Sequence, residues 1–174
     1  NKHLVFQFRG VEADDIAAYI TKNLDKYSFQ DCWLISSDKD WDLLINDRVS
    51  RFSTVTRKET TVYNWDDHYD FDIPDYITYK CLTGDKGDNI PGITGVGPKR
   101  AVQLMQQYGN VFDIYDACPI NDRYKYIQNL NEQSEQLLMN VELMDLLTYC
   151  EDAIGEDNGK VIDKTLGRIL NDRD

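Results

Sequence analysis

Glycine placement is the feature that most constrains this chain, because five of its ten glycines fall between Gly84 and Gly97 and Pro98 follows at once. Glycine allows a tight turn and lets the backbone approach a ligand closely. Proline is tolerated in the first turn of a helix. The segment therefore predicts a tight connection that opens directly into a helix over residues 98–108.

Two cations, Lys99 and Arg100, fall in the first turn of that expected helix, where the helix dipole disfavours positive charge. A phosphate in front of them would explain the pair, since a fresh helix start also offers free N–H groups to an anion. Such contacts hold a nucleic-acid backbone without reading its sequence. The simpler alternative is an ordinary connection between helices with an incidental basic pair. The candidate DNA contacts are Gly92, Gly95, Val96, Gly97, Lys99 and Arg100.

The first part of the chain alternates strand and helix signals. Apolar runs predict strands over residues 4–8 and 32–35, with a helix over residues 12–24 between them. The second run is continuously apolar, which suits a strand buried on both faces. A helical turn over 41–45 and strands over 49–53 and 60–63 follow. The order strand, helix, strand predicts part of a parallel α/β sheet.

The pattern changes near Asp72-Ile73-Pro74, where an aspartate can cap a helix and a proline can start one. From this point we expect helices only. They are predicted over residues 74–82, 98–108, 111–117, 122–130, 132–147 and 161–170, with a loop over residues 155–159.

Three groups of carboxylates stand at the boundaries of these elements. The seven residues are Glu12, Asp14, Asp15, Asp38, Asp40, Asp85 and Asp88. Each group also has a structural explanation, because acids complement a helix start and favour polar turns. Taken together they suggest a site at the carboxyl ends of parallel strands, where like charges would need cations to neutralise them. Hard oxygen ligands favour Mg²⁺ or Mn²⁺, and paired metals suit phosphodiester hydrolysis.

Composition agrees with an ordinary globular chain, with 41% hydrophobic and 29% charged residues. The formal net charge of −12 argues against a nucleic-acid partner on its face, but the seven carboxylates account for −7 of it and leave −5. No apolar stretch reaches membrane-spanning length, and the four scattered cysteines fit a reducing compartment. No rival catalytic triad or nucleotide-binding glycine motif occurs. We expect a cytoplasmic protein with no membrane partner.

Several segments of the sequence resemble those of a known family. The segment from Gly84 to Gly92, followed by Gly95-Val96-Gly97-Pro98-Lys99-Arg100-Ala101, resembles the helix–three-turn–helix signature of 5′-nucleases, which include flap endonucleases and bacteriophage 5′-exonucleases. The segments at residues 11–15 and 37–40 resemble the two metal-binding segments of that family. The tail at residues 125–131 is most similar to the phage members.

The resemblance implies a fold and a set of roles. The fold is an α/β class with the parallel-sheet portion of a PIN-like 5′-nuclease domain over residues 1–72, followed by a helical DNA-binding portion over 73–174. Glu12 and Asp14 correspond to ligands of a first metal, and Asp15 to a ligand or its supporting neighbour. Asp38, Asp40 and Asp85 correspond to ligands of a second, with Asp88 at its margin. The resemblance also implies a K⁺ ion at the glycine hairpin and catalytic roles for Glu12, Asp14, Asp38, Asp40 and Asp85.

The implied activity is Mg²⁺-dependent hydrolysis of DNA phosphodiesters at 5′ flaps or ends. We expect the protein to be a monomer, and to lie in the host-cell cytoplasm if a phage encodes it. The family has an N-terminal half, with further aspartates and catalytic cations, that nothing in these 174 residues matches. We therefore expect that half to be missing or a separate chain, and the 174 residues alone to cleave poorly. The alternatives are a DNA-binding module without turnover and a metal-dependent phosphatase acting on small substrates.

Overall fold

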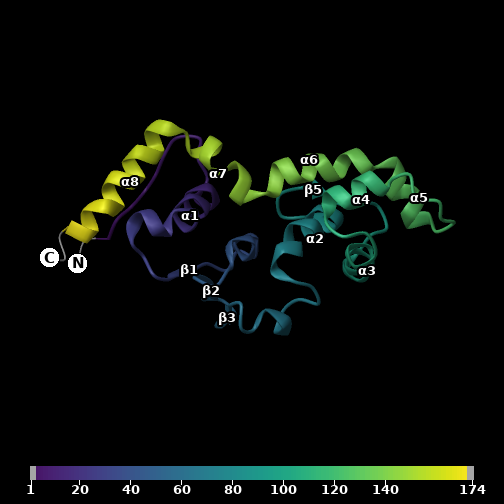
Figure 1. Ribbon diagram of the computed structural model, residues 1–174, viewed down its shortest axis with the longest axis horizontal. Coiled ribbons are helices and arrows are strands. Elements are labelled where there is room, and N and C mark those ends of the chain that lie inside the picture. Colours follow the sequence, from purple (N-terminus) through teal and green to yellow (C-terminus); the bar gives the residue numbers. More distant parts are fainter. Residues whose placement is uncertain (1–2, 172–174) are drawn as a thin grey trace. The chain divides into compact units, whose positions relative to one another are not determined.

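The computed structural model describes residues 3–171, which form a helix-rich α/β chain with a small sheet (Figure 1). The described residues divide into two compact units. The first comprises residues 3–65 and 146–171, and the second residues 66–145.

The first unit contains the sheet. It is built from α1 (Ala13–Lys22), the 3₁₀ turn η1 (Leu24–Tyr27), β1 (Cys32–Ile35), η2 (Asp40–Leu44), β2 (Val49–Ser53), β3 (Lys58–Thr60), α7 (Leu146–Ile154) and α8 (Glu156–Asn171). Strand β1 runs parallel to β2, with Cys32 opposite Val49, and β2 runs antiparallel to β3. The sheet is therefore mixed, with one parallel pair where a parallel sheet was predicted.

One face of β1 is covered and the other is open. Leu34 lies in a buried cluster with Ala17 and Ala18 of α1, whereas Trp33 is 52% exposed and Ile35 is 60% exposed. The prediction that this strand is buried on both faces is wrong for the described residues. An uninterrupted apolar run cannot by itself reveal whether a second layer covers the sheet.

The strand predicted over residues 4–8 does not form. Phe6 and Phe8 pack against a cluster that contains Tyr27 and Ile162, and the chain runs in an extended course along α8 (Figure 1). Gln7, between them, is exposed, and Val5, just before Phe6, is 82% exposed. Alternate burial thus comes from packing against helices, and it mimics the period of a strand without any ladder of backbone hydrogen bonds.

The loop predicted over residues 155–159 is also wrong, because only Gly155, at φ +74°, separates α7 from α8. Gly159 lies inside α8, where an added Cβ would come within 2.9 Å of the Tyr19 hydroxyl oxygen. This glycine serves close packing between helices rather than a turn. Glu156 and Asp157 lie in the first turn of α8, where they complement the dipole of that helix.

The second unit is a helical assembly around one core. Its elements are the 3₁₀ turn η4 (Ile73–Asp75), α2 (Tyr76–Thr83), β4 (Gly84–Asp85), β5 (Ile90–Pro91), α3 (Pro98–Tyr108), α4 (Val111–Ala117), α5 (Lys125–Glu132) and α6 (Ser134–Met144); η3 (Trp65–Asp67) spans the boundary between the units. The helices predicted over residues 98–108 and 111–117 are confirmed. The helix predicted over 132–147 ends instead at Met144, and the short antiparallel pair β4–β5 interrupts a part predicted to be helical throughout.

The packing divides the chain differently from the predicted portions, 1–72 and 73–174. Helices α7 and α8 bury Cys150, Ile154 and Ile162 in clusters of the first unit. None of the helices in the described part of the chain is long and apolar enough to cross a membrane.

Candidate metal and nucleic-acid sites

The start of α1 carries the first group of acids. Glu12 occupies the N-cap position, and its backbone N–H donates to the Asp15 carboxylate at 3.3 Å. Asp14 and Asp15 both lie in the first turn, where the helix dipole favours negative charge. Part of this group therefore has a structural role in starting α1, as the structural explanation predicts, while Glu12 remains exposed.

The second group follows the carboxyl end of β1. The Asp38 backbone N–H donates to Ser36 Oγ at 3.1 Å, and the Asp38 carboxylate accepts from the Asp40 backbone N–H at 2.9 Å. Asp38 thus closes the turn that begins η2. A polar turn at this place was the structural explanation for the pair, and the turn presents an exposed carboxylate at the end of a strand with a parallel neighbour.

Trp41 joins these two groups within the first unit. Its indole Nε1 donates to Asp14 Oδ1 at 2.7 Å, and Trp41 is the residue directly after Asp40. A fixed donor on one oxygen orients the Asp14 carboxylate. Sequence reasoning missed this residue, since it treated Trp41 only as the start of a helical turn, and no sequence signal marks an indole as the partner of a distant acid.

A nearby acid outside the predicted set has a structural role. Asp42 is fully buried and forms an ion pair with Arg51, which is itself 5% exposed. Arg51 also donates to Ser36 O at 3.1 Å and to Thr60 Oγ1 at 3.2 Å. These contacts tie η2 to β2, to β3 and to the residue that follows β1, and they fix the turn that carries Asp38 and Asp40.

The third group lies in the β4–β5 hairpin of the second unit. Asp85 Oδ1 accepts backbone N–H groups from Gly87 at 2.6 Å and from Asp88 at 3.2 Å, and the other carboxylate oxygen contacts Lys80. The hydrogen bond from Lys80 lowers the pKa of Asp85 below its usual value, against the effect of burial. Asp85 therefore stays ionised, as a metal ligand must be.

Two glycines permit this hairpin. A Cβ on Gly84, whose φ is +73°, would lie 2.2 Å from Gly92 N. A Cβ on Gly92 would lie 2.3 Å from the backbone carbon of Thr83. The backbones therefore approach too closely for any other residue at either position.

The segment from Gly92 to Gly97 forms a compact hairpin that is anchored by the core of the second unit and by side chains at α5. Ile93 and Val96 are buried in the core of the second unit, and the Val96 N–H donates to Ile93 O at 2.9 Å. Asn129 Nδ2 donates to Thr94 O at 2.8 Å, and the Thr94 N–H donates to Gln133 Oε1 at 2.8 Å. Side chains from α5 and the residue after it thus hold the hairpin, which sequence reasoning did not anticipate.

Lys99 and Arg100 are both exposed, yet their surroundings differ. Arg100 Nη1 donates to Gly95 O at 2.6 Å, and its guanidinium lies 4.6 Å from the centroid of the Tyr126 ring. Lys99 makes no ion pair with any residue in the described part of the chain, and it lines a groove together with Gly95, Gly97 and Arg100.

Comparison with known proteins assigns the chain to a protein family. The family profile described as 5′-3′ exonuclease, C-terminal SAM fold, matches residues 72–163. The chain therefore belongs to the 5′-3′ exonuclease family.

Within that family the chain is 47% identical to the flap endonuclease of Escherichia phage T5, across 95% of this chain and 57% of the relative. It is 28% identical to a 5′-3′ exonuclease of Aquifex aeolicus, across 95% of this chain and 55% of that protein. The chain thus spans somewhat more than half the length of these relatives.

Solved structures of related proteins are consistent with this family assignment. A crystal structure of the T5 protein co-crystallised with metal ions superposes with a TM-score of 0.87 at 45% identity, covering 94% of this chain and 62% of the other. A T5 flap endonuclease pseudo-enzyme–product complex with DNA and metal ions gives a TM-score of 0.88 at 44% identity, covering 95% and 62%.

Proposed function

We propose that this chain is the metal- and DNA-contacting part of a structure-specific 5′-nuclease that hydrolyses DNA phosphodiesters at 5′ flaps or ends. The observation that carries the proposal is the anchored glycine hairpin, which leads into α3 and leaves Lys99 exposed beside it. The hairpin backbone and this cation suit the phosphates of duplex DNA. The name of the related T5 complex, with DNA and metal ions, supports the same reading.

The proposal assigns divalent metal ions to the carboxylates of each unit. The first unit offers Glu12, Asp14, Asp15, Asp38 and Asp40, and the second offers Asp85 and Asp88. Their chemistry fits, because the donors are all carboxylate oxygens, which Mg²⁺ and Mn²⁺ prefer. The related T5 structures were obtained with metal ions, among them zinc.

A metal ion bound by such oxygens would lower the pKa of a bound water and neutralise charge on the phosphate. The protein residues have separate tasks. Trp41 and the Asp38 turn hold carboxylates in place, and Lys99 and the hairpin hold the duplex so that one phosphodiester is presented repeatedly in the same position. Catalytic roles are proposed for Glu12, Asp14, Asp38, Asp40 and Asp85.

Three finer assignments belong to the same proposal. The PIN-like sheet portion over residues 1–72 supplies most metal ligands, and the helix–three-turn–helix portion over 73–174 supplies most DNA contacts. A K⁺ ion is proposed at the glycine hairpin, where Gly95 O already accepts from Arg100. The protein is proposed to act as a monomer in the cytoplasm.

Cleavage of a labelled 5′-flap DNA in Mg²⁺ tests the proposal. Because the chain spans 57% of the T5 flap endonuclease, it is assayed alone and with the unmatched part of that protein added as a separate polypeptide. We expect cleavage near the junction after the addition, little by the chain alone, and loss of cleavage in an Asp38→Ala, Asp40→Ala variant.

The outcomes separate the alternatives. Salt-dependent binding of the duplex without cleavage under either condition would indicate a DNA-binding module. Hydrolysis of small phosphate esters without duplex binding would indicate a phosphatase. Cleavage that is unaffected by the double substitution would refute the metal assignment.

A further inference from the structure

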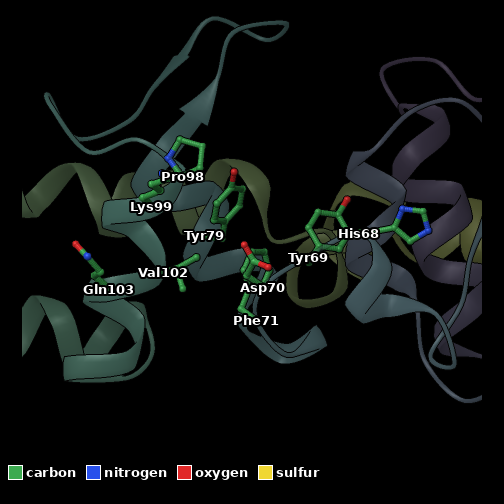
Figure 2. A pocket seen from close by; sticks show the side chains of 9 residues that line it. All are labelled: His68, Tyr69, Asp70, Phe71, Tyr79, Pro98, Lys99, Val102 and Gln103. Carbon is green, nitrogen blue, oxygen red and sulfur yellow. The ribbon is translucent and has the colours of Figure 1, made fainter.

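A cavity of about 400 Å³ lies in the second unit, and none of the carboxylates assigned above is among the residues that line it (Figure 2). One wall is aromatic and carries Tyr69, Phe71 and Tyr79, and the other is the start of α3 with Pro98, Lys99 and Val102. The volume lies at the lower end of the range for small-ligand pockets, roughly 300–1,000 Å³.

The aromatic wall is a preformed stack. The rings of Phe71 and Tyr79 are 4.8 Å apart between centroids with an interplanar angle of 26°, and Tyr69 lies 5.4 Å from Phe71. Tyr76, which is buried, packs edge-on against Tyr69, with 5.0 Å between the two ring centroids. The three rings that line the cavity are only partly buried, so the stack offers ring surface to a planar ligand.

Besides His68 and the hydroxyls of Tyr69 and Tyr79, the cavity is lined by three polar side chains, Asp70, Lys99 and Gln103, and two of these carry opposite charges. Lys99 is its cation, on the α3 wall, and Asp70 is its carboxylate, on the aromatic side. A ligand phosphate would therefore be drawn to Lys99 and repelled by Asp70. Asp70 and the amide of Gln103 remain available to exocyclic amino and carbonyl groups of a planar ring.

Lys99 also lines the groove at the glycine hairpin, so the two concavities share one cation. A phosphate held there in a bound DNA strand would leave the adjoining nucleotide at the mouth of the aromatic cavity. Moving a paired base out of its stack costs free energy for unpairing and unstacking, and this cost is lower for an unpaired terminal base.

We propose that this cavity binds a single nucleotide, with the base against the aromatic wall of Tyr69, Phe71 and Tyr79 and the phosphate at Lys99. The source we infer is an unpaired nucleotide at the end of a DNA strand that lies on the hairpin, and in this respect the inference rests on the proposed function. A free nucleoside monophosphate has the same chemistry and is the other possible source.

The probe is 2-aminopurine, whose fluorescence is quenched when it stacks. It is placed as one unpaired overhanging nucleotide on a short duplex, and in parallel it is supplied as the free deoxynucleoside monophosphate. A blunt duplex of the same sequence is titrated alongside. We expect quenching with the overhang and an affinity higher than for the blunt duplex.

Phe71→Leu and Tyr79→Leu are made separately, so that one remains informative if the other does not fold. Either change should remove the quenching and weaken binding of the overhang duplex by roughly 5-fold or more, because stacking on aromatic side chains is lost. Binding of the blunt duplex should not change. Phe112→Leu, at an exposed ring on α4 outside the cavity, is the matched control and should behave as the parent.

Failure of this inference is distinguishable from failure of the proposed function. Binding of the blunt duplex without any quenching from either probe would overturn the nucleotide cavity and leave the nuclease proposal standing. Quenching by the free monophosphate alone would support the cavity and assign it to free nucleotides. Absence of both binding and quenching would overturn both.

Discussion

At the scale of single residues, adjacent side chains in one helical turn have different tasks. Lys99 and Arg100 looked equivalent in the sequence, as a pair of cations awaiting a phosphate. In the structure the Arg100 guanidinium contacts Gly95 O and the Tyr126 ring, while Lys99 faces the groove. Arg100 therefore helps to shape the hairpin, and Lys99 is the cation available for a ligand.

Substitutions at these positions should separate the two tasks. Lys99→Ala should lower the slope of log affinity against log salt concentration by about 0.9, with little change in thermal stability. Arg100→Ala should in addition cost about 1 kcal/mol of stability, because a hydrogen bond to a carbonyl and a cation–π contact are lost. Binding titrations at several salt concentrations and thermal melting measure both effects. Equal melting temperatures for the two variants would contradict the distinction.

The indole of Trp41 is expected to tune metal affinity through Asp14. Trp41→Phe removes the Nε1 donor and retains an aromatic ring, so Mn²⁺ binding should weaken by about 10-fold while the fold persists. Isothermal calorimetry measures the affinity. Trp33→Phe, at a half-exposed indole on β1, is the control. An unchanged Mn²⁺ affinity in Trp41→Phe would show that the hydrogen bond is only structural.

At the scale of elements, two glycines that look alike in the sequence meet different demands. Gly84→Ala should destabilise the protein by at least about 2 kcal/mol, because its φ is positive and its Cβ would overlap backbone atoms. Gly97 has φ −103° and nothing within 4 Å of an added Cβ. Gly97→Ala should therefore leave stability within about 0.5 kcal/mol of the parent and still weaken duplex binding, since the methyl group projects where DNA is proposed. Normal duplex binding by folded Gly97→Ala would argue against close backbone approach.

Helix α8 is attached to η1 by an acid-sensitive contact. Asp163 accepts from the Tyr27 hydroxyl at 2.6 Å and from Lys26. Burial opposes ionisation of Asp163, but these hydrogen bonds outweigh it and lower its pKa below the usual value. The contact thus adds stability above the pKa of an unfolded aspartate, about 3.9, and this contribution disappears as pH falls through the lower pKa of the folded state.

Denaturant midpoints measured from pH 7 down to pH 2.5 test this linkage. Asp163→Asn should be less stable than the parent at pH 7, and the difference should shrink as pH falls below about 4. Asp157→Asn, at an exposed acid in the first turn of the same helix, supplies the comparison. A difference between parent and Asp163→Asn that stays constant with pH would mean that Asp163 acts by packing alone.

At the scale of the whole molecule, the net negative charge predicts how divalent cations affect thermal stability. The chain carries a formal charge of −12, and seven proposed ligands account for −7 of it. If these carboxylates bind cations, Mn²⁺ should raise the thermal midpoint, because a ligand that binds only the folded state stabilises it. The Asp38→Ala, Asp40→Ala variant should lose much of this rise. The Asp66→Ala, Asp67→Ala variant removes the same charge from exposed positions in η3 and should show the same Mn²⁺-dependent rise in thermal midpoint as the parent. Equal rises in thermal midpoint for the two double variants would indicate that Mn²⁺ acts by diffuse screening of charge.

Local signals in the sequence were sufficient for much of this protein. The sequence predicted α3 and α4 with their observed bounds, and Pro98 marked the start of α3. In the structure Asn110 caps α4, so both helix starts depend on groups within one turn of the chain. The order of residues from Gly84 to Arg100 indicated both the hairpin and the family. These features depend on neighbours in sequence, so they can be read before the chain folds.

Other features depended on partners distant in the sequence. Exposure of one face of β1, the packing of α7 and α8 in the first unit and the helical course of residues 156–159 are set by what packs against each segment. The bond from Trp41 to Asp14 spans 27 residues, and that from Tyr27 to Asp163 spans 136. The sequence by itself determined which residues could carry the chemistry and where helices begin, whereas only the tertiary structure decided which side chains meet, because burial and hydrogen bonding depend on atoms that the chain brings together from afar.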